Sequence, residues 1–89
     1  MDIDFDPGKD ITNQAKHGVS LAQAEELEWE ELLAIPDKRD DYGEQRYIGY
    51  APIGRRLYCV VFTDRSLTRR IISLRKANSR EVKRYVEHQ

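Results

Sequence analysis

The chain has 89 residues, enough for one domain with a small core, so we expect residues 1–89 to form a single unit. With 39% hydrophobic and 35% charged residues, it has the composition of a folded protein rather than a disordered one. No stretch of the sequence is long and apolar enough to span a membrane, and no apolar signal core follows the acidic first residues. The single cysteine allows no internal disulfide. These observations favour a cytoplasmic protein over a membrane or secreted one.

The charge is divided unevenly along the chain, although the net charge is only −1. Residues 1–44 carry 13 acidic and 4 basic residues, a net −9, whereas residues 45–89 carry 3 acidic and 11 basic residues, a net +8. This asymmetry indicates a dipolar molecule whose basic part binds a polyanion. Two halves that neutralise each other on packing would give the same numbers, and charge alone leaves both interpretations open.

The N-terminal half predicts a short strand and two helices. Residues 3–5 alternate as an edge strand does. Asp6 is placed as the N-cap of a helix over residues 7–16, which ends where Gly18 suits the left-handed C′ position. A second helix is predicted to begin at the capping box formed by Ser20 and Gln23.

The rest of the chain predicts four strands and a final helix capped by Ser79. The strands are expected at residues 32–35, 46–51, 57–63 and 68–75, and residues 57–63 are apolar on both faces, as in a central strand. Strict alternation in the last strand places Ile72 and Leu74 on one face, and Arg69, Ile71, Ser73 and Arg75 on the other. This order predicts an α+β fold: an antiparallel sheet of about four strands, two N-terminal helices and a C-terminal helix.

Several segments together carry a family resemblance that covers essentially the whole chain. The most specific are N-x-x-K-H-G-V at residues 13–19 and R-I-I-S-x-R-K-A at residues 70–77. The others are F-D-P-x-K at residues 5–9, D-Y-G-E-x-R at 41–46, V-V-F-T-x-R at 60–65, and Arg80, Glu81 and Tyr85. In these segments the chain resembles the BrnT family of bacterial toxin–antitoxin toxins.

The resemblance implies a RelE-like toxin fold and cleavage of RNA that suppresses translation and growth. It also implies a BrnA-type antitoxin with a ribbon-helix-helix DNA-binding part. The toxin and antitoxin would form a tight complex that represses their own operon, so that operator DNA is contacted only through that complex.

The side chains of this chain can meet the implied chemistry without a cofactor. When the 2′-hydroxyl of RNA attacks the phosphorus, the enzyme supplies a base, an acid and cations for the phosphate charge. The catalytic candidates are His17, with its neutral-range pKa, Glu44 and Arg46, whose spacing puts both on one side of a strand, and Arg75. Which group is the base stays open. His17 and His88 are far apart in sequence, and no metal set is expected.

Further basic residues are candidate RNA contacts, and the face of Arg75 is expected to be the RNA face. They are Lys16, Arg69, Arg70, Lys76 and Arg80. Ordinary roles stay open for these residues, such as helix-dipole contacts for Lys16 and His17 and a surface ion pair for Glu44 and Arg46. As a surface residue, Arg75 is expected to contribute no more than roughly 0.5 kcal/mol to stability. Cys59 and Tyr85 are interpreted as core residues.

Two classes of function fit these observations. The first is a metal-independent endoribonuclease toxin. The second is a non-catalytic module that binds RNA, DNA or a protein through the same basic residues. A DNA-binding regulator acting alone is not supported, because no helix-turn-helix or ribbon-helix-helix pattern carries the basic residues.

Overall fold

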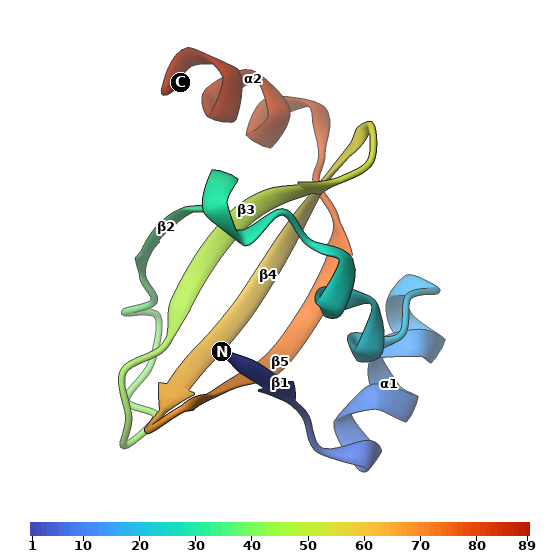
Figure 1. The fold of residues 1–89 in the computed structure, drawn as a ribbon, viewed down its shortest axis with the longest axis vertical. Coiled ribbons are helices and arrows are strands. Elements are labelled where there is room, and N and C mark those ends of the chain that lie inside the picture. Colours follow the sequence, from blue (N-terminus) through green and yellow to red (C-terminus); the bar gives the residue numbers. More distant parts are fainter.

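Five strands form one sheet in the order β1-β5-β4-β3-β2, with helical segments around it (Figure 1). The computed structural model describes all 89 residues. In chain order the elements are β1 (Asp2–Asp4), α1 (Pro7–His17), η1 (Leu21–Glu26), η2 (Trp29–Glu31), β2 (Leu33–Pro36), β3 (Tyr47–Ile53), β4 (Arg56–Arg65), β5 (Thr68–Lys76) and α2 (Ser79–Glu87). Neither α-helix has the length or apolar character that a membrane crossing needs.

The α+β class is confirmed, but the sheet is mixed and has one strand more than the four in the prediction. Strands β2 to β5 pair antiparallel with their neighbours. Strand β1 is the fifth, and its residues pair in parallel with Thr68–Arg70 of β5. The sequence predicted the short strand but could not assign its partner, which lies more than sixty residues further along the chain.

Local capping signals place the first helix where they predicted it. The Asp6 carboxylate accepts a hydrogen bond from Lys9 N at 3.0 Å, and Gly18 closes the helix in the left-handed conformation, with φ of 71°. The capping box of Ser20 and Gln23 also forms, but it opens a six-residue 3-10 segment instead of an α-helix. The prediction of two N-terminal α-helices was therefore wrong for the second. Its chain turns away at Leu27, whose N–H bonds back to Ala24 O.

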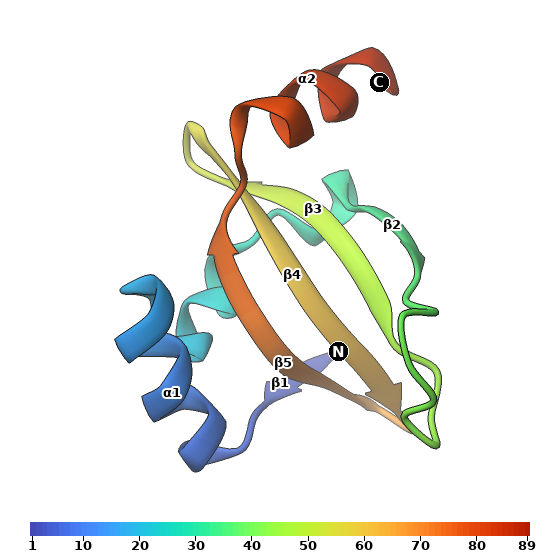
Figure 2. The same cartoon turned by 180° about the vertical axis from the view of Figure 1, so that it is seen from behind.

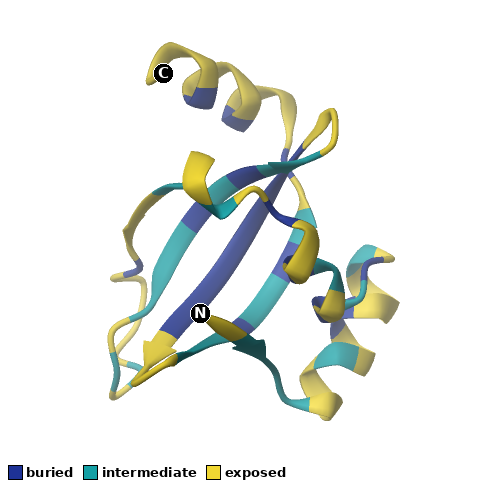
Figure 3. Cartoon of the chain, in the orientation of Figure 1, coloured by how far each residue is buried: buried dark blue, intermediate teal, exposed yellow.

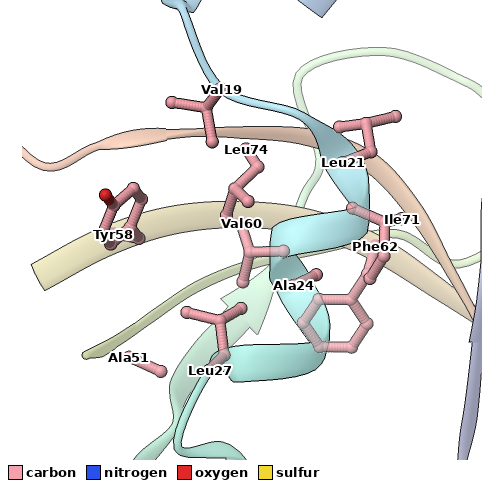
Figure 4. Close-up of a cluster of buried hydrophobic side chains, with 10 residues drawn as sticks. All are labelled: Val19, Leu21, Ala24, Leu27, Ala51, Tyr58, Val60, Phe62, Ile71 and Leu74. Atoms are coloured by element: carbon pink, nitrogen blue, oxygen red, sulfur yellow. The ribbon is translucent and has the colours of Figure 1, made fainter. Parts of the chain in front are cut away.

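The hydrophobic core lies between η1 and one face of the sheet. Its buried side chains come from residues 19–27 and from β3, β4 and β5 (Figure 4). Phe62 packs edge-to-face with Trp29. Strand β4 is the most buried strand (Figure 3), which confirms the prediction of a central strand. Cys59 and Tyr85 are buried as well, as expected.

A β-bulge in β5 changes which side chains share a face. Val61 pairs with Ser73 and the next residue, Phe62, pairs with Ile71, so Ile72 is an extra residue without a partner. Ile71 and Leu74 therefore both point into the core, where each is fully buried. The strict alternation predicted from the sequence was wrong. Arg69 lies on the core face, and Arg70 shares the opposite face with Ser73 and Arg75.

The buried side chain of Asn13 attaches α1 to β5. Its amide nitrogen donates to Val19 O and Leu74 O at 2.8 Å each, and its Oδ1 accepts from Leu74 N at 3.2 Å. One side chain thus satisfies both backbone groups of Leu74 and closes the turn after the helix. This contact sets the C-terminal end of α1, with Lys16 and His17, beside β5.

We predict that Asn13→Ala lowers the free energy of unfolding by about 2–3 kcal/mol, because it leaves buried backbone groups without partners. Urea denaturation measures the decrease. Gln14→Ala is the matched control, since Gln14 makes one exposed side-chain hydrogen bond, to Asp10. Equal decreases in the two variants would show that the Asn13 contact does not attach the helix.

Candidate functional site

The sheet face opposite the core has no helix lying across it, as Figure 2 shows from behind. We call it the open face. By the strand register it carries Ile48 and Tyr50 of β3, Cys59, Val61, Thr63 and Arg65 of β4, and Arg70, Ser73 and Arg75 of β5. Helix α1 lies beside β5 and α2 lies at one end of the sheet (Figure 2). Both helices therefore frame the open face, and α2 covers only its end, where Tyr85 packs with Leu57 and Tyr50.

A hollow on the open face brings together side chains from several parts of the chain. It is lined by Lys16, His17, Arg39, Ile48, Tyr50, Cys59, Val61, Ser73, Arg75 and Glu81. Its apolar floor comes from the middle of β3 and β4, and its polar rim carries three cations, Lys16, Arg39 and Arg75, and one carboxylate, Glu81. The hollow unites two of the four predicted catalytic residues, His17 and Arg75, which are far apart in sequence.

His17 is half-buried at the end of α1, where the surroundings favour its neutral form. Burial lowers its pKa below the ordinary value of 6.5, and the positive charges of Lys16 and Arg75 lower this pKa further. A neutral imidazole can accept a proton, so this environment suits a general base.

Arg75 is fixed in place by the carboxylate of Glu81. Two guanidinium nitrogens of Arg75 donate to the two oxygens of Glu81, each at 2.9 Å. The same carboxylate accepts from the Tyr50 hydroxyl and from Asn78 N, both at 2.9 Å. The Arg75 ion pair and these hydrogen bonds hold the pKa of Glu81 down at about 2, against the desolvation that would raise it.

This ion pair corrects the expectation that Arg75 is a surface residue with little effect on stability. The side chain of Glu81 is 9% exposed, so removal of Arg75 leaves a buried carboxylate without its cation. Removal of such a partner costs about 1–3 kcal/mol, more than an ordinary surface change. A decrease in activity on removing Arg75 must therefore be separated from a decrease in folding.

Glu44 and Arg46, the other two predicted catalytic residues, lie away from the hollow. Glu44 accepts from Arg65 at 3.0 Å, and Arg46 Nε lies 3.8 Å from Glu44. The two residues are thus brought together, as their spacing predicted, but as members of a charged cluster. Arg46 directly precedes Tyr47, which pairs with Phe62, so Arg46 falls beside Thr63.

The predicted RNA contacts are distributed over both faces of the sheet. Lys16 lines the hollow and Arg70 lies on the open face. Arg69 does not share the face of Arg75, because the bulge turns it to the core side, where it pairs with Asp64 at 2.8 Å and covers the Trp29 and Phe62 rings. Lys76, opposite Tyr58, also points away from the open face, and Arg80 is exposed on α2.

Glu81, Tyr50 and Arg39, whose side-chain hydrogen bonds organise the hollow and its rim, were not among the sequence candidates. Glu81 was named only within the resemblance to the family, without a role in the site, and Tyr50 and Arg39 were not singled out. Asn78, not the predicted Ser79, is the N-cap of α2. The signal for Glu81 was its place three residues after Asn78, because the two form a capping box that fixes the carboxylate at the start of α2. Arg39 pairs with the buried Asp37 at 2.8 Å, which orders the loop beside the hollow.

These features define a class: a small α+β protein with a cationic open sheet face and a neutral histidine at its rim, suited to binding and transforming a polyanion. No three His, Cys, Asp or Glu side chains gather in a metal-binding arrangement. The chain belongs to the BrnT family of type II toxin–antitoxin systems, because the family model described as "Ribonuclease toxin, BrnT, of type II toxin-antitoxin system" matches residues 5–81. The family resemblance in the sequence is thereby confirmed. No individual curated protein matches the chain.

Membership assigns the chain a general activity and a general partner. Proteins of this family are ribonuclease toxins, and a type II system pairs its toxin with a protein antitoxin. The match includes His17, Arg75 and Glu81, so these residues of the hollow lie within the matched part of the chain.

We predict that His17 titrates below pH 6.5 and that Lys16→Gln raises its pKa, because removal of a neighbouring positive charge makes protonation easier. NMR titration of the imidazole measures both values. Lys38→Gln is the control, since Lys38 is not among the charges that shift this pKa. A pKa that is the same in wild type and Lys16→Gln would contradict the placement of Lys16 beside the ring.

Proposed function

We propose that this chain is an endoribonuclease toxin that cleaves RNA through the RNA's own 2′-hydroxyl, without a metal ion, and so inhibits translation and growth. The observation that carries the proposal is the hollow, which brings neutral His17 beside two cations, Lys16 and Arg75. The hollow therefore supplies two of the three groups that this reaction requires, a general base and cations that stabilise the phosphate charge.

In this mechanism His17 takes the proton from the 2′-hydroxyl. The 2′-oxygen forms a bond to the adjacent phosphorus, and the bond from phosphorus to the 5′-oxygen breaks. The products are a 2′,3′-cyclic phosphate and a 5′-hydroxyl whose proton comes from water on the open face. His17 then releases its proton to solvent and is ready for another turnover.

The cations stabilise the negative charge that grows on the phosphate oxygens in the transition state. The planar fork of Arg75 suits phosphate, and its ion pair with Glu81 fixes its orientation before substrate binds. Glu81 and Tyr50 act as positioning residues, because their polar groups bind Arg75 or each other. Glu44 is not used as the base, since it is ion-paired outside the hollow.

We predict that purified protein cleaves single-stranded RNA in EDTA and that His17→Ala lowers the rate on the order of 10²-fold or more. His88→Ala is the control, because His88 is exposed near the C-terminus. Activity should fall as the pH drops through the lowered pKa of His17. A strict need for added Mg²⁺ or Mn²⁺ would refute the mechanism, and RNA binding without cleavage would favour a non-catalytic module.

We also propose that the antitoxin partner is of the BrnA type, with a ribbon-helix-helix part through which the complex binds operator DNA. An acidic antitoxin segment would cover basic residues between Arg65 and Arg84 and compete with RNA. Of these, Arg65, Arg70 and Arg75 lie on the open face, so we expect the antitoxin to contact the toxin on that face. The acidic segments η1 and η2 lie on the opposite side (Figure 1).

We predict that antitoxin binding protects backbone amides of β4 and β5 and of the α1 C-terminus more than those of residues 25–31. Hydrogen exchange of the toxin, alone and in its complex with the protein of the adjacent gene, measures the difference. Protection confined to residues 25–31 would place the antitoxin on the wrong side of the sheet for this proposal.

A further inference from the structure

A second cationic cluster lies on the open face, at the end of β4 away from α2. It consists of Arg46, Arg65 and Arg70 around Thr63, with the carboxylates of Glu44 and Asp4. Three arginines against two carboxylates leave the cluster one net positive charge. None of these residues lines the hollow.

The ion pairs of Arg46 and Arg70 are the loosest in the molecule. Arg46 lies 3.8 Å from Glu44 and Arg70 lies 3.4 Å from Asp4, whereas the other four pairs measure 2.8–3.0 Å. Arg46 Nε is buried and has no hydrogen-bond partner. The Tyr42 ring, 4.1 Å from the guanidinium carbon of Arg46, holds that group in place. Arg70 makes one long hydrogen bond, from Nη1 to Asp4 Oδ2 at 3.4 Å. The remaining guanidinium nitrogens of Arg46 and Arg70 make no hydrogen bond within the protein, as in a site that receives an anion.

The spacing along the sheet separates this cluster from the reaction centre. Arg75 pairs with Cys59 and Arg70 pairs with Thr63, four residues further along β4. At the rise of an extended strand this is roughly 13 Å, too far for one phosphate to contact both arginines. Two phosphates of one RNA strand that follows β4 can occupy both places.

We propose that Arg46 and Arg70 form a second phosphate subsite, which binds a backbone phosphate of the RNA strand away from the bond that is cut. This inference rests on the proposed function, because the reaction centre at His17 and Arg75 defines the first subsite. The subsite would fix the direction of the strand across the open face. It would also make longer RNA a better substrate than a dinucleotide, which has a single phosphodiester.

The test uses the Arg46→Gln/Arg70→Gln double variant, with Arg69→Gln as the control from the core face. Binding of a 2′-O-methyl RNA octanucleotide, which has no free 2′-hydroxyl to attack, is measured by fluorescence anisotropy over a range of salt concentrations. Each phosphate that the variant no longer binds should make the slope of log K against log salt shallower by about 0.7. The double variant should show this change, and Arg69→Gln should keep the wild-type slope.

Cleavage kinetics test the same subsite on a reactive substrate. For an RNA octanucleotide, KM should rise about tenfold in the double variant, as expected when one charge-assisted hydrogen bond to the substrate is removed, with kcat near the wild-type value. For a dinucleotide, wild type and double variant should have equal kcat/KM. A double variant that lowers kcat/KM on the dinucleotide as well would put these arginines in the reaction centre and overturn the subsite.

Controls separate failure of the subsite from failure of the proposed function. If wild type cleaves RNA but the double variant behaves as Arg69→Gln does, the subsite is wrong and the function stands. If wild type binds the octanucleotide and cleaves nothing, the function is wrong and the salt slope still decides the subsite. Arg46→Gln alone provides the same comparison if removal of the ion pair between Arg70 and β1 prevents folding.

Discussion

The carboxylate of Glu81 is the group on which the organisation of the hollow depends. It accepts four hydrogen bonds, from Arg75, Tyr50 and the backbone of Asn78, and so joins α2 to β3 and β5. Because these partners all favour the charged form, the group stays ionised although it is buried. Arg75 is held in one orientation as a result, and the hollow keeps its shape without a helix across it.

The two faces of the sheet have different roles: one buries the hydrophobic core and the other carries the charged side chains of the candidate site. One face buries the core against η1, and β4 contributes Tyr58, Val60 and Phe62 to that core. The other face carries Arg70 and Arg75, and the buried side chains of Cys59 and Val61 form part of the floor of its hollow. A small domain has little apolar surface to spare, so one covered face and one charged face suits its size.

The opposite charges of the two halves of the chain are partly paired with each other and partly separated on opposite sides of the sheet. Three of the six ion pairs join an acidic residue of the first half, Asp4 or Glu44, to an arginine of residues 45–89. The two halves therefore neutralise each other in part. The acidic residues of η1 and η2 form no ion pairs and lie on the core side, while Arg70 and Arg75 lie on the open face. The molecule is therefore dipolar across the sheet, which supports a polyanion on the open face.

The sequence by itself determined what short-range signals control: the caps of α1, the capping box at Ser20, the central strand, and the family. It did not determine the parallel pairing of β1, the bulge at Ile72 or the contacts of Asn13 and Glu81. The bulge depends on how β5 fits β4 and α1, and one extra residue reverses the facing of every side chain beyond it. For that reason Arg69 lies on the core face and Arg70 on the open face, the reverse of the prediction. Only the tertiary structure showed that Arg75 lies in the same hollow as His17.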